Sequence, residues 1–186
     1  YSIAVLIPLT IANQQYWFVD HGMIVTVALA SAVFCLFNLR PKGKARCFAG
    51  DVGSIGIAFI MLFFIGRLMV STLDPTWLIL LIVYGADGCL TIVHRIMLHE
   101  NLGTAHRKHA YQIMANELQL EHVKIALLYA GVQLCISIGF IFLCPNSSIC
   151  HWIYLLCVMT LLTVAYVAFM KKYYHMHEKY LASLNH

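Results

Sequence analysis

The stretch V-G-S-I-G-I-A-F-I-M-L-F-F-I-G-R-L-M-V, residues 52–70, decides the class of this protein. A helix needs about 20 predominantly apolar residues, with about 17 as a lower limit, to cross the hydrocarbon core of a bilayer. The stretch meets that requirement, and its single charge, Arg67, stands near its C-terminal end. The sequence therefore predicts a membrane-spanning helix here.

The remainder of the chain repeats this pattern. Of its 186 residues, 61% are hydrophobic and 11% are charged, whereas a soluble protein carries about twice that charge. We expect an all-α, polytopic transmembrane helix bundle of about six spans, forming one transmembrane domain over residues 1–186. The segment at residues 1–12 is short, as expected of a helix whose beginning is missing. The further candidate spans are residues 1–12, 22–37, 77–93, 125–143 and 152–170.

The connectors between these segments fall into two classes by charge. Residues 13–21, 71–76 and 144–150 contain no Lys or Arg, and every basic residue except Arg67 falls on the opposite side. By the positive-inside rule the basic side is cytoplasmic. This places loops 38–51 and 94–124, the tail 171–186 and both ends of the chain there. No aromatic-interleaved basic patch is present, so nucleic acid is not an expected partner.

The G-D-V-G-S sequence at residues 50–54 places a carboxylate at the start of the span at 52–70. Asp51 fits an ordinary polar helix start, where the helix dipole favours an acid. Gly50 and Gly53 leave the backbone N–H groups uncrowded, which suits the binding of a phosphate or diphosphate. A carboxylate and a phosphate are both anions, so a divalent cation must mediate between them. Magnesium, which prefers carboxylates, waters and phosphate oxygens, is the expected cofactor, and Ser54 would join the binding site.

The long loop 94–124 is rich in histidine and is predicted to contain an amphipathic helix over residues 105–118, capped by Thr104. Such a helix can lie in the headgroup plane. His106 and His109 are spaced i, i+3 and share a face beside Arg107 and Lys108. They form either a solvated polar face or a cationic cluster that binds phosphate. Zinc is disfavoured because H-E-x-x-H is absent and no third ligand is evident.

Three further features leave alternatives open. Asp87 inside a span is a functional hypothesis by default; it either faces the site, as metal support or structural support, or pairs with Arg67. Asn38 either holds a base or sugar or caps its helix. Cys144 and Cys150 flank a short loop and are either free thiols or a disulfide.

Two stretches resemble one family. F-N-L-R-P-K-G-K-A-R-C-F-A-G-D-V-G-S-I-G, residues 37–56, looks like the signature F-x-x-N-x-x-P-A-x-x-F-x-G-D-x-G-S-x-x-x-G, and residues 94–117 look like a cytoplasmic histidine loop. Both resemble the polyprenyl-phosphate N-acetylhexosamine-1-phosphate transferases of bacteria. The resemblance covers about residues 28–117, and the topology extends it to the C-terminus.

The resemblance implies an enzyme of the bacterial cytoplasmic membrane that transfers a sugar-1-phosphate from a UDP-sugar to a polyprenyl phosphate and releases UMP, in cell-envelope polysaccharide synthesis. It implies catalytic roles for Asp51, as magnesium ligand, and for His106 and His109. Substrate would be bound by Asn38, Gly50, Gly53, Ser54, Arg107 and Lys108. Homodimers are common in the family, so a homodimer is a possible state.

The chain departs from the family pattern in ways that qualify this expectation. Members have about ten spans and a D-D-x-x-D motif, which is absent here, and the histidine loop has Tyr111 and Gln112 where many members have a later histidine. We therefore interpret the chain as the C-terminal part of a longer protein and expect these residues alone to be inactive. The alternatives are a transporter or channel using Asp87 and Arg67, a haem- or quinone-binding protein, and a structural membrane subunit.

Overall fold

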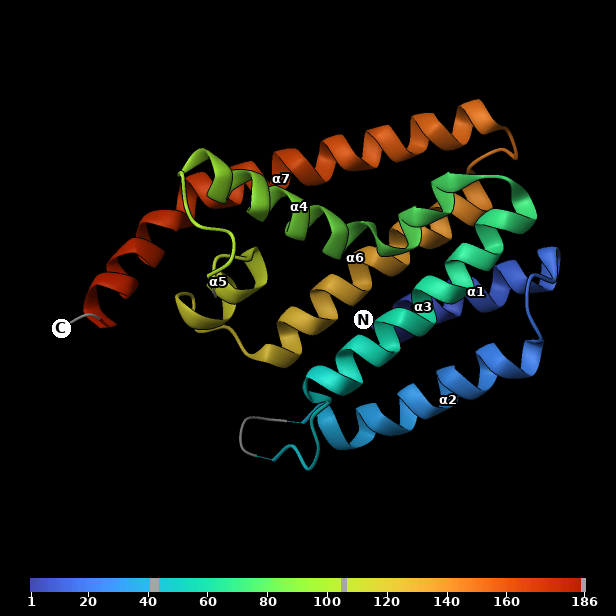
Figure 1. The fold of residues 1–186 in the computed structure, drawn as a ribbon, viewed down its shortest axis with the longest axis horizontal. Helices are drawn as coiled ribbons and strands as arrows, with labels where there is room; N and C mark the ends of the chain where they lie inside the picture. The colour runs from blue at the N-terminus through green and yellow to red at the C-terminus, as the bar shows by residue number, and fades with distance from the viewer. Residues whose placement is uncertain (41–43, 105–106, 185–186) are drawn as a thin grey trace.

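The computed structural model describes residues 1–40, 44–104 and 107–184, with side chains up to Met176, and within these ranges the chain contains helices and no strand. An all-α bundle is thereby confirmed (Figure 1). The elements are α1 (Ser2–Tyr16), α2 (His21–Asn38), α3 (Gly50–Thr72), the 3-10 helix η1 (Pro75–Leu81), α4 (Ile82–Met97), α5 (Ala110–Asn116), α6 (His122–Leu143) and α7 (Ser148–Leu184).

Five helical segments of the described chain are long and apolar enough to cross a membrane, which confirms a polytopic membrane protein. They are His21–Asn38, Gly50–Thr72, Pro75–Met97, His122–Leu143 and Ser148–Met176. The remaining predicted segment forms α1, whose 15 residues are fewer than a span needs. Helix α1 instead lies at the centre of the fold, where it packs against α2, α3 and α6. Val5, Leu6 and Leu9 on it are fully buried.

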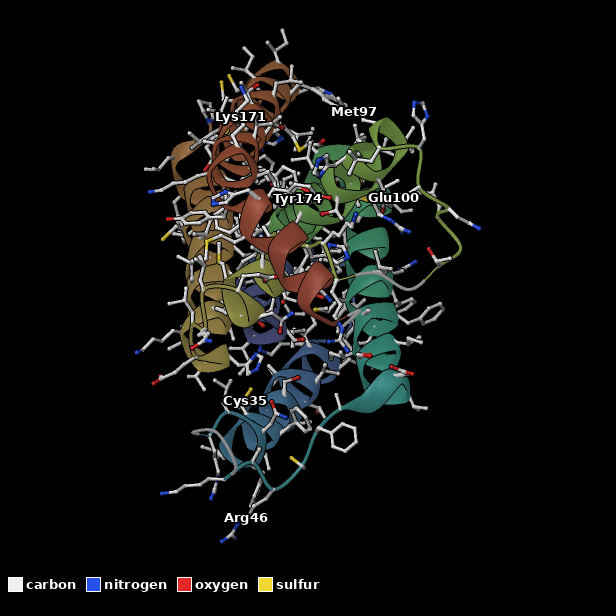
Figure 2. The ribbon with its side chains drawn as sticks, turned by 90° about the vertical axis from the view of Figure 1, so that its left-hand side faces the viewer. Cys35, Arg46, Met97, Glu100, Lys171 and Tyr174 are labelled. Atoms are coloured by element: carbon white, nitrogen blue, oxygen red, sulfur yellow. The ribbon has the colours of Figure 1, made fainter. Side chains whose placement is uncertain are left out.

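The connectors gather at two ends of the bundle. The short turns joining α1 to α2, α3 to η1 and α6 to α7 lie at one end, on the right of Figure 1. The α2–α3 loop, the α4–α6 segment with α5 and the C-terminal part of α7 lie toward the other. Figure 2 views the molecule from that second end, with Arg46 at the bottom of the view and Glu100 and Lys171 in its upper half. We call this the basic end.

The candidate span Pro75–Met97 changes from a 3-10 helix to an α-helix along its length. Residues Pro75–Leu81 are 3-10 and Ile82–Met97 are α-helical, so backbone groups at the junction lose their regular partners. Gln133 of α6 bonds the backbone on both sides of the junction: its Nε2 donates to the Ile79 carbonyl at 2.9 Å, and its Oε1 accepts from Val83 N–H at 3.1 Å. The Ile79 carbonyl also accepts from Ile82 N–H. Irregular backbone is tolerated at this depth where protein groups satisfy it. The fully buried Gln133 does so here.

The end opposite the basic end is braced by side chains. Asp74 caps η1 by accepting from Thr76 N–H at 2.9 Å, and its other oxygen lies 2.5 Å from His151 Nδ1. Burial tends to raise the pKa of Asp74, but hydrogen bonds from Thr76 and His151 outweigh it and lower the pKa below its usual range. Arg67 donates to the Phe18 carbonyl at 3.3 Å, near the α1–α2 turn. Cys144 and Cys150 are free thiols.

A helix is present in the loop between α4 and α6, but it is shorter than predicted. Helix α5 begins at Ala110 with His109 as N-cap, rather than after Thr104. Thr104 is held elsewhere, because its carbonyl accepts from Arg95 at 3.2 Å and its hydroxyl donates to the Asn101 carbonyl. Ala110 and Ile113, on the apolar face of the predicted amphipathic helix, are buried within the protein. This face of α5 therefore packs on the bundle rather than on lipid.

Candidate functional site

The centre of the candidate site is the buried carboxylate of Asp87, on α4 one and a half turns from its start. Its Oδ1 accepts from the backbone N–H of Ala110, the first residue of α5, at 3.0 Å. Its Oδ2 accepts from the Tyr129 hydroxyl of α6 at 3.3 Å and lies 3.9 Å from His109 Nδ1. Asp87 is only 5% exposed. One carboxylate thus connects three elements, and the pairing of Asp87 with Arg67 considered from the sequence is not what the structure has.

His109 is held from several directions. Its ring stacks on Tyr111, with the centroids 5.4 Å apart and the planes 17° from parallel. Its backbone N–H donates to Gln112 Oε1 at 3.3 Å. Tyr111 in turn packs edge-on against Tyr129. Burial, and then the nearby charge of Asp87, raise the pKa of the Tyr111 phenol, so Tyr111 is a neutral aromatic support at physiological pH.

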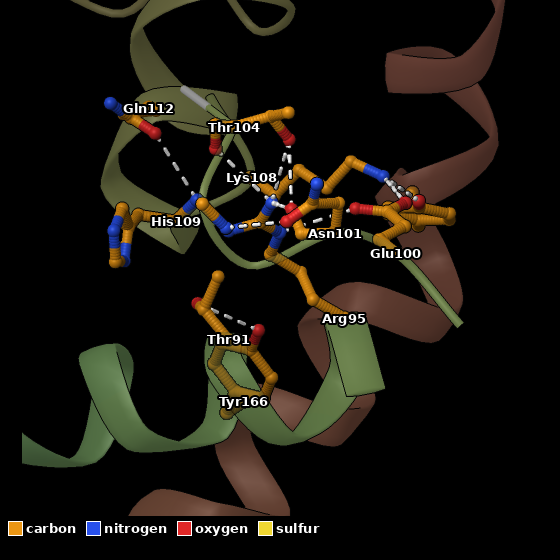
Figure 3. A network of polar contacts seen from close by, with 11 residues as sticks. Thr91, Arg95, Glu100, Asn101, Thr104, Lys108, His109, Gln112 and Tyr166 are labelled. Atoms are coloured by element: carbon orange, nitrogen blue, oxygen red, sulfur yellow. Dashed lines mark hydrogen bonds and ion pairs between the residues drawn. The ribbon is translucent and has the colours of Figure 1, made fainter. Parts of the chain in front are cut away.

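The loop before His109 is organised by Arg95 at the end of α4 (Figure 3). This buried guanidinium donates to Glu100 Oε2 at 3.2 Å and to the carbonyl of Asn101 at 2.6 Å. Glu100 also accepts from Lys108, which reaches the Tyr174 hydroxyl of α7 at 3.1 Å. The loop between α4 and α5 is therefore fixed to both α4 and α7.

The charges in this network stabilise one another. Hydrogen bonding from Lys108 is the main cause that lowers the pKa of Glu100, with Arg95 adding to it. Burial lowers the pKa of the Lys108 ammonium, but its hydrogen bonds with Glu100 and Tyr174 outweigh burial and leave the pKa raised. Lys108 therefore remains a cation, and its ammonium group forms an ion pair with Glu100. Its neighbour Arg107 is exposed, and His106 lies outside the described residues.

The G-D-V-G-S segment forms the first turn of α3 at the basic end. Asp51 is exposed, and among the described residues none donates a hydrogen bond to its carboxylate. The Ser54 hydroxyl donates to the Asp51 carbonyl at 3.1 Å. Gly50 has φ of +60°, a conformation that residues with a Cβ adopt at a cost. A side chain at position 53 would be crowded, because a Cβ on Gly53 would lie 3.2 Å from the Cβ of Ala49.

Asn38, the last residue of α2, braces the basic loop that leads to this segment. Its Nδ2 donates to the Cys47 carbonyl at 2.8 Å, so one side chain closes the base of the loop. The sequence left open a contact to a base or sugar and a helix cap. The observed bond joins the two ends of the loop and leaves its exposed residues, Lys44 and Arg46, facing outward.

Two adjacent pockets form a groove that begins at Asp87. A pocket of about 180 Å³ lies between α4, α5, α6 and α7, and a second of about 440 Å³ lies between α6 and α7. Leu128, Val132 and Leu162 line both, so the two pockets are adjacent. Apart from Asp87, Tyr129 and Tyr166, the first is lined by apolar side chains, as is the second.

The structure brings some predicted residues together and keeps others apart. His109 lies beside Asp87 and Lys108 beside Glu100, whereas Asn38 and Asp51 flank the separate α2–α3 loop toward the same end of the bundle (Figure 1). The described part of the chain contains no group of three or more His, Cys, Asp or Glu residues that would hold a metal ion by itself. Sequence reasoning missed Arg95, Glu100 and Tyr129. A charge at a span end and a tyrosine within an apolar run carry no signal without their partners.

In comparisons with protein-family models, curated proteins and solved structures, the chain has no match.

Proposed function

We propose that these residues form part of a polyprenyl-phosphate N-acetylhexosamine-1-phosphate transferase. The observation that carries this proposal is that the G-D-V-G-S helix start and the histidine loop lie toward the same end of the bundle (Figure 1). That end holds the basic connectors, so we place it in the bacterial cytoplasm. Arg46, Arg107 and Lys171 there would attract an anionic nucleotide-sugar.

In the proposed reaction an oxygen of the lipid phosphate attacks the sugar-linked phosphorus of the UDP-sugar. The bond between that phosphorus and the bridging oxygen breaks, and UMP leaves with that oxygen. Such phosphoryl transfer depends mainly on positioning and charge neutralisation. His109 and Arg107 would contact the phosphates, and Asp51 would hold magnesium.

A magnesium ion fits the residues present, provided that the substrate supplies the other ligands. Magnesium is commonly held by one or two carboxylates together with waters and phosphate oxygens, and the exposed Asp51 carboxylate is one such group. When bound, the ion would neutralise charge on the departing UMP. Asp51 would orient it, and the left-handed Gly50 sets the direction in which Asp51 leaves the loop.

The groove between α6 and α7 supports a lipid acceptor. It is apolar, lies between spans and begins beside Asp87, so a prenyl chain placed there would keep its phosphate toward the basic end. The transporter alternative is less well supported, because Arg67 bonds near the α1–α2 turn while Asp87 bonds α5, and the two charges do not face one another.

The proposal is tested by Asp51→Asn in the full-length gene product, reconstituted with magnesium, UDP-N-acetylglucosamine and a polyprenyl phosphate. We expect UMP release in the wild type and a loss of at least about 100-fold in the variant, which is about 2.7 kcal/mol of transition-state stabilisation. The thermal midpoint should change little because Asp51 is exposed. Glu121→Gln is the matched control, an exposed carboxylate in a loop of the same end.

Two results would count against the proposal. If the wild type releases no UMP from any UDP-N-acetylhexosamine, the transferase function is wrong. If Asp51→Asn turns over like the wild type, the assignment of Asp51 is wrong. The isolated 186 residues should be inactive, because they lack the D-D-x-x-D motif.

A further inference from the structure

Asp87 has a geometry that goes beyond holding two elements together. Each carboxylate oxygen has its own protein partner, Ala110 N–H for Oδ1 and the Tyr129 hydroxyl for Oδ2. The third neighbour is a titratable ring, with His109 Nδ1 at 3.9 Å from Oδ2. Burying a carboxylate in a span costs several kcal/mol unless its surroundings compensate. The hydrogen bonds from Ala110 and Tyr129 compensate for this cost, at the point where the histidine loop packs on the bundle.

His109 is oriented so that its two ring nitrogens are not equivalent. Nδ1 faces the buried Asp87, and one ring face is covered by Tyr111. The His109 side chain is still 23% exposed, so the ring reaches the surface of the basic end. A carboxylate beside one imidazole nitrogen helps to hold the ring in a defined orientation, and the exposed part of the ring can contact a ligand.

The backbone contact strengthens this coupling. Ala110 follows His109 directly, and its N–H is fixed on the same carboxylate at 3.0 Å. Asp87 therefore restrains both the main chain next to His109 and the ring itself. Helix α5 has seven residues, too few to be stable alone, so it cannot hold this orientation without such an anchor.

We propose that Asp87 is the positioning residue of His109: it fixes the main chain beside His109 and the orientation of the ring, so that the exposed part of the ring contacts a phosphate of the nucleotide-sugar. The role toward substrate rests on the proposed transferase function. The coupling of Asp87 to His109 does not, and it is measurable by itself.

Asp87→Asn is the informative substitution, because an amide oxygen still accepts from Ala110 N–H while the charge is lost. Loss of a group that orients a metal-ligating histidine costs about 10- to 100-fold. By analogy we expect kcat to fall by about that factor, with KM for the UDP-sugar within about threefold. The matched control is Thr91→Val, one turn further along α4. It removes the hydrogen bond to Tyr166 and should stay within about twofold of wild type.

A double-mutant cycle separates positioning from a general structural role. If Asp87 acts through His109, Asp87→Asn has no further effect on kcat in a His109→Gln background, because coupled residues are non-additive. If it lowers kcat by the same factor in both backgrounds, Asp87 is a structural anchor and the proposal is overturned. Thermal midpoints of all four proteins identify any loss due to unfolding.

A second measurement does not use activity. In protein labelled with ¹⁵N-histidine, the His109 signals are assigned from their loss in His109→Gln. We expect the ring ¹⁵N signals of His109 to shift in Asp87→Asn, because the charge beside Nδ1 is lost. Identical His109 signals in both would refute the coupling. If the wild type releases no UMP, the proposed function fails alone, and these spectra still decide whether Asp87 positions His109.

Discussion

Single buried polar side chains determine how this bundle joins its pieces. Gln133 satisfies the backbone on both sides of the η1–α4 junction, and Tyr1 donates to the same amide oxygen at 2.6 Å. Arg95 and Asp87 play comparable roles where α4 meets the loop. In an apolar environment an unsatisfied polar group is costly, so these residues specify which backbone segments meet.

Replacing Gln133 by Leu should destabilise the protein by about 1–3 kcal/mol, because the Val83 N–H loses its side-chain acceptor and the Ile79 carbonyl loses one of its two donors. The free energy of unfolding in mixed micelles is the measurement. Gln15→Leu, an exposed glutamine on α1, is the control and should have little effect. Equal stability of the two variants would show that the junction is satisfied in another way.

The Glu100 network predicts a pH dependence of the loop between α4 and α5. Because Lys108 and Arg95 lower the pKa of Glu100 from its usual 4.5, the stabilisation from this carboxylate is complete above pH 4.5. It is lost as the pH falls through the lower folded-state pKa. Hydrogen exchange of residues 98–104, corrected for intrinsic rates, should be faster in Glu100→Gln than in wild type at pH 7. The two should converge at low pH; a constant difference would exclude this carboxylate as the cause.

At the scale of elements, helix α5 shows why a loop helix needs its surroundings. It packs on α6 and α7, and the fully buried Ile113 contributes its apolar contact. The sequence predicted this helix from its apolar stripe, but it placed the start near Thr104. The start is instead set by long-range contacts, since Asp87 lies 23 residues before Ala110, and no local pattern reports such a distance.

The α6–α7 contact provides an element-scale prediction. A Cβ at Gly139 would overlap the Tyr154 hydroxyl, whereas the Tyr154 Cζ would be at 3.5 Å, an ordinary contact. Gly139→Ala should therefore destabilise the protein by about 1–3 kcal/mol, and Tyr154→Phe should remove most of that penalty although it loses the bond to the Ile136 carbonyl.

The free energies of unfolding of the two single variants and the double variant measure this coupling. Gly131→Ala is the matched control on α6, because no atom lies within 4 Å of a Cβ there. Additive effects of Gly139→Ala and Tyr154→Phe would mean that the overlap is relieved by a shift of the helices.

At the scale of the whole molecule, the division into two ends was predictable from the sequence. Spans and connectors can be predicted from local hydropathy and charge, because each residue contributes its own free energy of transfer into lipid. The position of α1 in the centre was not predictable, since its apolar residues read like those of any span. Likewise the sequence indicated Asp51, His109 and Asp87, but the contacts among α4, α5 and α6 required the folded chain.

Single-cysteine labelling should verify the two ends. In variants otherwise free of cysteine, Cys47 in the α2–α3 loop and a cysteine replacing Ser147 in the α6–α7 turn should react with an impermeant maleimide from opposite sides of the membrane. In sealed right-side-out vesicles we expect the position 147 thiol to react at once and Cys47 to react only after permeabilisation. Labelling of both from one side would contradict the arrangement of the spans.

The carboxylate of Asp87 also constrains the order of biosynthesis. Helix α4 leaves the ribosome before Ala110 and Tyr129, the two groups that hydrogen-bond its carboxylate. During that interval α4 carries an uncompensated charge, which opposes stable release into lipid. The junction between η1 and α4 also lacks a partner during that interval, because Gln133, which accepts from Val83 N–H, is synthesised after Tyr129. We therefore expect membrane integration of α4 to be completed together with α6, as a helical hairpin, rather than one segment at a time.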